Sequence, residues 1–266
     1  MNIHERSGNA NGRATMISKV FCTASAIVLA SFVLSSAAWA ATCSNASLSG
    51  TYGFLHLGTD GSGTPATAAV TQIRFDSTTG TFTGETTASH DGVIANEPLT
   101  GTYTVASNCT GTGNPSGLAP FSIVVTSTGF LALHLFAEGF AVAQGSPACN
   151  NAEVKGSFGF ETTGVFLAEA TTAVAFIGEL KLTVNSSGEG VISGRIAASE
   201  NGTFLTFPEE PVTGTYKVDA DCRGMATITP KGLPEMHFRL VVVDCGKEML
   251  AIETDANTVV SGAFQR

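Results

Sequence analysis

An internal repeat constrains the fold of this 266-residue chain more than any other feature of its sequence. The stretch that begins at Cys43 recurs, element by element, from Cys149 to the C-terminus. The offset between matched segments only grows along the chain, as happens when turns lengthen while strands keep their register. Two similar folding units are therefore expected. The matched residues are Cys43 with Cys149, Gly50 with Gly156, Gly53-Phe54 with Gly159-Phe160, Gly101-Thr102-Tyr103 with Gly214-Thr215-Tyr216, and Cys109 with Cys222.

The N-terminal segment has the pattern of an export signal. Basic residues precede an apolar run over residues 20–34, and small residues follow at Ala38 and Ala40. The run is shorter than the roughly 20 residues that a membrane-spanning helix needs. We therefore predict a signal peptide over residues 1–40 and a secreted or periplasmic protein with no membrane span after cleavage.

Short strands dominate both repeats. Leu180, Leu182 and Val184 alternate with polar residues, which is typical of a half-buried strand, and the turn at 185–188 leads into a second strand. Seven or eight such strands can be identified in each copy, with no convincing amphipathic helix. The sequence predicts an all-β protein of two tandem, similar antiparallel units that pack together, at 41–148 and 149–266. Each unit is a barrel or a sandwich, and a barrel is preferred because closure leaves no exposed edge.

Two segments depart from simple alternation. Residues 130–136 are apolar on both faces except for His134, and residues 173–177 are apolar throughout. Strands that are apolar on both faces need cover from another element. We therefore expect the two units to pack together through a face that includes the 130–136 strand.

The repeat also predicts the disulfides. It equates Cys43 with Cys149 and Cys109 with Cys222, so the simplest pairing is Cys43 with Cys109 and Cys149 with Cys222. Cys245 then has no partner within the chain. It is expected to be an unreactive thiol, a reactive thiol or the site of an intermolecular crosslink. A bridge from Cys222 to Cys245 is the alternative. The cysteines lie too far apart in sequence for the short spacing of zinc sites, so no metal site is predicted.

The charge balance limits the partners. The chain has a net charge of −9, and Arg74 is the only lysine or arginine of the first repeat. Binding of nucleic acid or anionic lipid needs clustered cations, so neither is expected. The scarcity of tryptophan and tyrosine argues against the aromatic belts of an outer-membrane barrel. The sequence leaves the oligomeric state open.

No catalytic constellation is visible in the sequence. The histidines do not recur at equivalent places in the two repeats, and no glycine-rich phosphate loop precedes a helix, so no cofactor is predicted. His90-Asp91-Gly92 reads as a turn between strands. If a cavity holds convergent polar groups, His56, Glu161 and Arg195 are the candidate ligand-binding residues.

Both repeats contain a Gly-Thr-Tyr-x-Val element followed by a Cys-x-Gly turn, at 101–111 and 214–224. This motif, with the ending at 258–262, resembles one in secreted bacterial proteins of uncharacterised function. In element count each unit is also similar to the small eight-stranded barrels of lipocalins and allene oxide cyclases. The resemblance implies a barrel topology, and no catalytic residue of those two families maps onto this chain.

Three functions are compatible with these features. The first is an exported non-enzymatic protein that binds a small apolar or extended ligand in or between its barrels, or a cell-surface component. Inward-facing Phe, Leu and Val residues would line such a cavity, and a packed core is the alternative. The second is a surface structural or adhesive module. The third is a small-barrel enzyme of the cyclase or isomerase kind.

Overall fold

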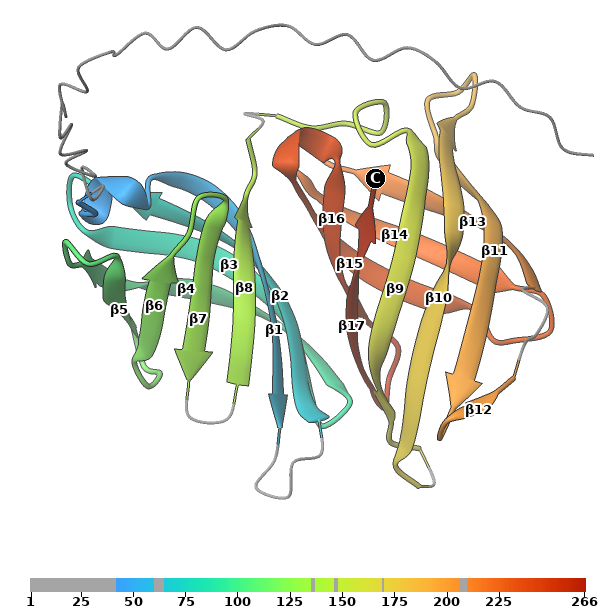
Figure 1. The fold of residues 1–266 in the computed structure, drawn as a ribbon. Helices are drawn as coiled ribbons and strands as arrows, with labels where there is room; N and C mark the ends of the chain where they lie inside the picture. The colour runs from blue at the N-terminus through green and yellow to red at the C-terminus, as the bar shows by residue number, and fades with distance from the viewer. Residues whose placement is uncertain (1–41, 60–64, 135–136, 146–147, 169, 206–209) are drawn as a thin grey trace, which may run out of the picture. The chain divides into compact units, whose positions relative to one another are not determined.

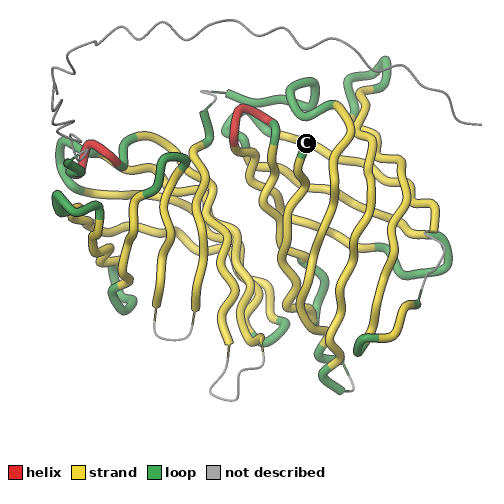
Figure 2. Tube along the Cα trace, viewed as in Figure 1, coloured by secondary structure: helices red, strands yellow, loops and turns green. Residues whose placement is uncertain are grey.

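The structure is a computed structural model. It describes residues 42–59, 65–134, 137–145, 148–168, 170–205 and 210–266. The predicted signal peptide and residues 135–136 of the predicted interface strand lie outside these ranges. The described chain consists mainly of strands, with two short helical turns (Figure 2).

Eight antiparallel strands form the first barrel. Each strand pairs with the next along the chain, and β8 pairs with β1 to close the ring. Because the ring is closed, every strand is paired on both edges. The first unit is therefore a barrel, the form preferred from the sequence, and not a sandwich. The strands, coloured blue to green in Figure 1, are β1 (Gly50–Thr59), β2 (Pro65–Asp76), β3 (Thr81–His90), β4 (Val93–Val105), β5 (Thr110–Pro115), β6 (Phe121–Val125), β7 (Gly129–His134) and β8 (Ala137–Ala143).

The second barrel repeats this arrangement. The sheet order runs from β10 through β9 and β17 back to β11, and the pairing of β10 with β11 closes it. A two-residue strand, β12 (Thr203–Phe204), pairs with β11. The predicted all-β fold of two similar antiparallel units is thus confirmed. The ring strands are β9 (Gly156–Phe166), β10 (Thr172–Val184), β11 (Gly190–Glu200), β13 (Glu210–Val218), β14 (Arg223–Pro230), β15 (Met236–Val243), β16 (Glu248–Glu253) and β17 (Thr258–Gln265).

Alternating side chains divide each strand between the inside and the outside of its barrel. In β10, Phe176, Leu180 and Leu182 are buried inside, whereas Glu179 and Lys181 lie outside. The turn at 185–188 joins β10 to β11, and Asp91-Gly92 turns β3 into β4, as the sequence predicts. These elements depend on contacts within one hairpin, which is why local sequence identifies them.

Both barrel interiors are packed cores. Phe82, Tyr103 and Phe130 are fully buried in the first barrel, and Phe75 lies 4.8 Å from Tyr103 between ring centroids in an edge-to-face pair. Phe158, Phe160, Phe238 and Phe264 form the corresponding core of the second barrel. The packed-core alternative therefore describes the interiors better than a ligand cavity does.

A third apolar cluster joins the two barrels. Leu55 and Val70, on the outer face of β1 and β2, pack with outward residues of β9 and β15–β17, which include Leu250 and Val259. Polar contacts border the cluster, because the Ser89 hydroxyl donates to the Thr258 carbonyl and the Arg223 guanidinium pairs with Glu85.

The prediction that the two units pack together through the 130–136 strand was wrong. Leu131 and Leu133 of β7 are exposed, while Phe130 and Ala132 point into the first barrel. Ile177 is likewise 58% exposed in the second barrel, although residues 173–177 are apolar throughout. An apolar outer face in sequence does not specify which neighbour covers it, or whether any neighbour does.

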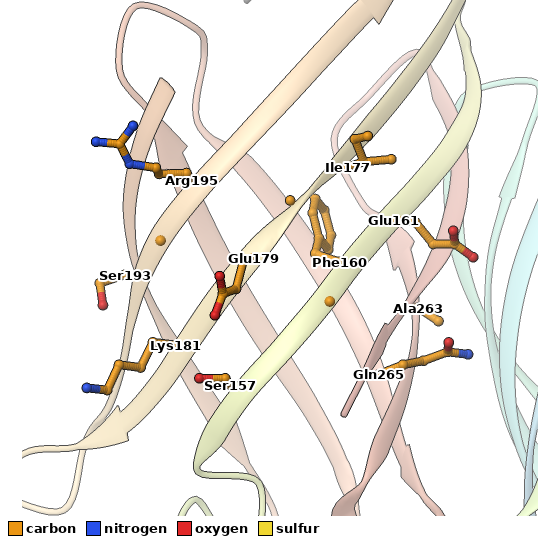
Figure 3. A pocket seen from close by; sticks show the side chains of 13 residues that line it. Ser157, Phe160, Glu161, Ile177, Glu179, Lys181, Ser193, Arg195, Ala263 and Gln265 are labelled. Atoms are coloured by element: carbon orange, nitrogen blue, oxygen red, sulfur yellow. The ribbon is translucent and has the colours of Figure 1, made fainter. Parts of the chain in front are cut away.

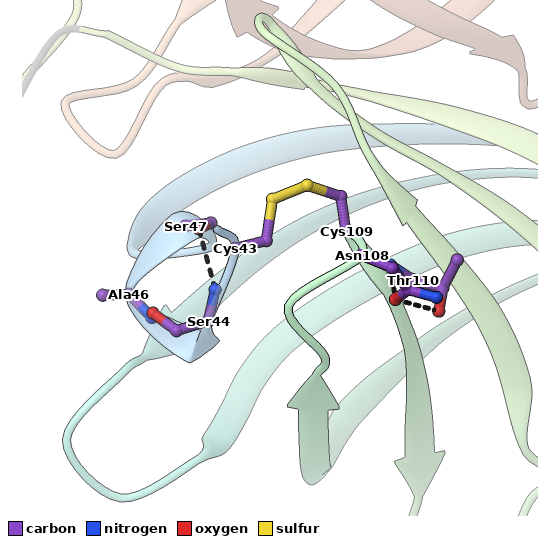
Figure 4. Close-up of a disulfide and its surroundings, with 7 residues drawn as sticks. All are labelled: Cys43, Ser44, Ala46, Ser47, Asn108, Cys109 and Thr110. Atoms are coloured by element: carbon purple, nitrogen blue, oxygen red, sulfur yellow. Dashed lines mark hydrogen bonds between the residues drawn. A yellow bond between two sulfur atoms is a disulfide. The ribbon is translucent and has the colours of Figure 1, made fainter. Parts of the chain in front are cut away.

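Two disulfides join the pairs that the repeat predicts, Cys43 with Cys109 and Cys149 with Cys222. Each ties the segment before a barrel to the turn between its fourth and fifth ring strands. In the first barrel this segment is a short helical turn, η1 (Asn45–Ser47), whose start is capped by Ser44 and Ser47 (Figure 4). Cys245, in η2 (Asp244–Gly246), is free and exposed.

Candidate functional site

The structure separates the three candidate residues of the sequence. His56 lies on β1 of the first barrel, at a position that alternation turns inward, where its ring lies 5.8 Å from that of Phe54. Glu161 and Arg195 lie on β9 and β11 of the second barrel and line one shallow groove on its outer face. The three residues therefore do not form a single site.

This shallow outer groove has a volume of about 750 Å³. Figure 3 shows Glu179, Lys181 and Arg195 extending from its strands, with Ser157 and Gln265 nearby. Its lining comes from one convex barrel face and carries charges of both signs. Such a face is typical of a solvated sheet surface.

A larger groove, which we call the inter-barrel groove, is lined by both barrels and has a volume of about 890 Å³. The first barrel contributes β3 and β4. The second contributes Asn151, the turn at 187–190, β13–β15 and the turn after β16. Its lining combines hydroxyl, amide, apolar and charged groups. The polar and charged lining residues include Asn96, Thr215, Thr227, His237, Arg239 and Asp255.

His237 is fixed in the lining by two carboxylates. Its Nδ1 lies 2.8 Å from an oxygen of Asp255, and its Nε2 lies 3.1 Å from Glu235. The backbone N–H of His237 also donates to Asp255 at 2.8 Å. The hydrogen bond to Asp255, helped by the charge of both carboxylates, raises the pKa of His237. An imidazolium bonded at both nitrogens has no free lone pair, so His237 is poorly suited to act as a general base.

Behind this pair, Glu253 is 3% exposed and its Oε2 atom has no hydrogen-bond partner among the described residues. Burial raises the pKa of Glu253 to about 8, and the charge and hydrogen bond of Asp255 act in the same direction. Glu253 is therefore a neutral carboxylic acid at and below neutral pH. Its burial keeps it out of contact with anything bound in the groove.

Arg239 is the cation in the lining that is available to a ligand. Its side chain is partly exposed on β15, and it forms no ion pair or hydrogen bond within the described part of the chain. Lys217, in contrast, pairs with Asp219 at 2.7 Å. A planar guanidinium with free donors suits a carboxylate, sulfate or phosphate group.

The described residues contain no cluster of three or more His, Cys, Asp and Glu side chains that could hold a metal ion. Over the same ranges, no helix has the length and apolarity needed to cross a membrane. Two disulfides are typical of an oxidising, extracytoplasmic compartment.

Sequence reasoning missed Arg239, His237 and Asp255. Alternation along β15 places His237 and Arg239 on the outer face, next to the inward Phe238, and this signal was readable in the sequence. The groove itself was not readable, because its other wall comes from strands more than a hundred residues away.

No family model and no curated protein matches the chain. One solved structure, a protein of unknown function from the DUF3598 family of Nostoc punctiforme, is 12% identical. The match covers 83% of this chain and 97% of that one, with a TM-score of 0.27.

Proposed function

We propose that this is an exported, non-enzymatic binding protein that holds an extended ligand in the inter-barrel groove. The observation that carries the proposal is the groove itself, which both barrels line and in which Arg239 has no partner among the described residues. The packed interiors leave the space between the barrels as the better location for a ligand. The predicted signal peptide and the two disulfides support export.

The charges indicate the ligand class. The chain carries a net charge of −9, which repels a polyanion. Arg239 nevertheless offers one cationic anchor, and Asn96, Thr215 and Thr227 offer hydrogen-bonding groups along the lining. We infer an extended, mostly neutral ligand that carries a single acidic group. A small, purely apolar ligand fits this lining less well.

Native mass spectrometry of the exported protein, recovered gently from its own host, tests the proposal. We expect a bound small molecule or oligomer, an N-terminus at Ala41, and a mass that reports two disulfides and one thiol. Arg239→Gln should lose the bound species. Arg195→Gln, a matched control on the outer face of the same barrel, should retain it. Wild-type protein that is free of ligand, or loss of ligand in both variants, would overturn the proposal.

A further inference from the structure

An apolar patch is exposed on the outer face of the first barrel. Its members are Val124, Leu131, Leu133 and Phe140, with exposures of 46%, 51%, 62% and 36%. Val124 pairs with Leu131 across β6 and β7, and Leu131 pairs with Phe140 across β7 and β8. The side chains are therefore contiguous, and we call them the β6–β8 patch. A contiguous exposed apolar patch marks an interaction surface more often than single exposed residues do.

The same face of the second barrel is an interface. β15, β16 and β17 occupy the places in their ring that β6, β7 and β8 occupy in theirs. Val241, Leu250 and Ala263 pair across them in the same register as the patch residues. All three are at most 4% exposed, because they pack against the first barrel. The β6–β8 patch is thus the repeat equivalent of a face that is covered within the chain.

The β6–β8 patch of one copy is not expected to dock onto β9 and β10 of another copy, in the way that β15–β17 pack against β1 and β2 within the chain. Within the chain, the partner face on β1 and β2 presents Leu55, which pairs with Val70. The equivalent place on β9 holds Glu161, which pairs with Ile177. Docking of the patch of one copy onto this face of another would remove the Glu161 carboxylate from water without an apolar partner, which is costly.

We propose that the β6–β8 patch binds the same patch of a second copy, in a two-fold symmetric dimer. In this arrangement apolar side chains meet apolar side chains and no charge is buried at the centre. Ser122 and Glu138, which pair with Leu133 from either side, form a polar rim that stays in water. The contact is also continuous with the inter-barrel interface, because Val142 of β8 packs against the cluster between the barrels.

Sedimentation velocity of the full exported chain over a concentration series tests the dimer. We expect a monomer–dimer equilibrium with no larger species. Leu131→Glu should weaken it by on the order of 100-fold, because two buried carboxylates enter each dimer. Leu118→Glu is the matched control, since Leu118 is 64% exposed on the same barrel but lies outside the patch. It should leave the equilibrium unchanged.

Thermal unfolding of each variant shows whether it is folded, and Leu133→Glu replaces Leu131→Glu if the latter is not. A wild-type protein that stays monomeric at its solubility limit would overturn the proposal. So would a dimer that survives both patch substitutions. Species that grow beyond the dimer with concentration would overturn the two-fold arrangement and favour the chain-to-chain contact instead.

Discussion

The side-chain oxygen of Asn151 accepts a hydrogen bond at 2.7 Å from the backbone N–H of Val218, 67 residues further along the chain. In the first barrel the side chain of Asn45 accepts one from Val105 at 2.8 Å. The Tyr216 hydroxyl donates to the carbonyl of Asn151 at 2.9 Å, as the Tyr103 hydroxyl does to that of Asn45 at 3.0 Å. Each barrel therefore has the same arrangement, in which an asparagine before the first ring strand binds the end of the fourth.

Replacement of this asparagine should destabilise the second barrel. Asn151→Ala leaves the N–H of Val218 without its acceptor and removes the donor to the Gly188 carbonyl. We expect a loss of about 2 kcal/mol in the free energy of unfolding, measured with a denaturant. Asn114→Ala is the control, because Asn114 is exposed on β5 and its side chain has no hydrogen bond within the described ranges. A loss of equal size in both variants would contradict the role assigned to Asn151.

The disulfide beside this contact should contribute a comparable or larger stabilisation. The bridge from Cys149 to Cys222 closes a loop with a sequence separation of 73. In the chain-entropy model, replacement of both cysteines by alanine should cost about 4 kcal/mol, because the unfolded chain gains freedom. Equilibrium unfolding of the double variant measures the loss. Cys245→Ala, which removes the free thiol, should leave the midpoint nearly unchanged.

The contact between the barrels can be tested at Gly92. A Cβ atom at Gly92 would lie 2.5 Å from the Cα of Asn257 in the second barrel, and Gly92 has a φ of +79°. Gly117 has a φ of +77° with nothing within 4 Å of the added atom. Gly117→Ala should cost about 1 kcal/mol from backbone strain alone, and Gly92→Ala about 2 kcal/mol more from the clash.

The difference in stability between the two glycine variants, measured by thermal and denaturant unfolding, reports the clash between the barrels, since the backbone strain is nearly the same in both. Equal losses would mean that the second barrel does not press against this turn in solution.

The buried carboxyl of Glu253 should make stability depend on pH. The pKa of Glu253 is raised to about 8 in the folded protein from an ordinary value of 4.5, so the native state keeps a proton that the unfolded chain releases. The stability that this group contributes is fully present below pH 4.5. It falls by about 1.4 kcal/mol per pH unit as the pH rises toward 8.

Glu253→Gln should remove this dependence, since the amide stays neutral at every pH. Relative to wild type, the variant should become progressively more stable from about pH 5 to about pH 8 in denaturant unfolding. Glu161→Gln, on the outer face of the same barrel, is the control, and its difference in stability from wild type should stay constant over this pH range. A constant difference in stability between Glu253→Gln and wild type across this range would contradict the raised pKa of Glu253.

Several features follow from the sequence alone because they depend on local contacts or on the repeat. The period-two pattern around Leu180, the turn at 185–188 and the pairing of Cys149 with Cys222 were all predicted. Each depends on residues within one hairpin or on the equivalence of the two copies. The asparagines that match at Asn45 and Asn151 carried the same repeat signal and were overlooked.

The tertiary structure decided which outer faces are covered. Leu55 and Leu131 are both outward apolar residues on strands of one barrel, yet Leu55 is 7% exposed and Leu131 is 51% exposed. The difference arises because the second barrel packs against β1 and β2 and not against β7. The same packing placed Arg239 in a groove and separated His56 from Glu161. Alternation in a strand specifies the side on which a residue lies, but only the assembled barrels determine what lies opposite.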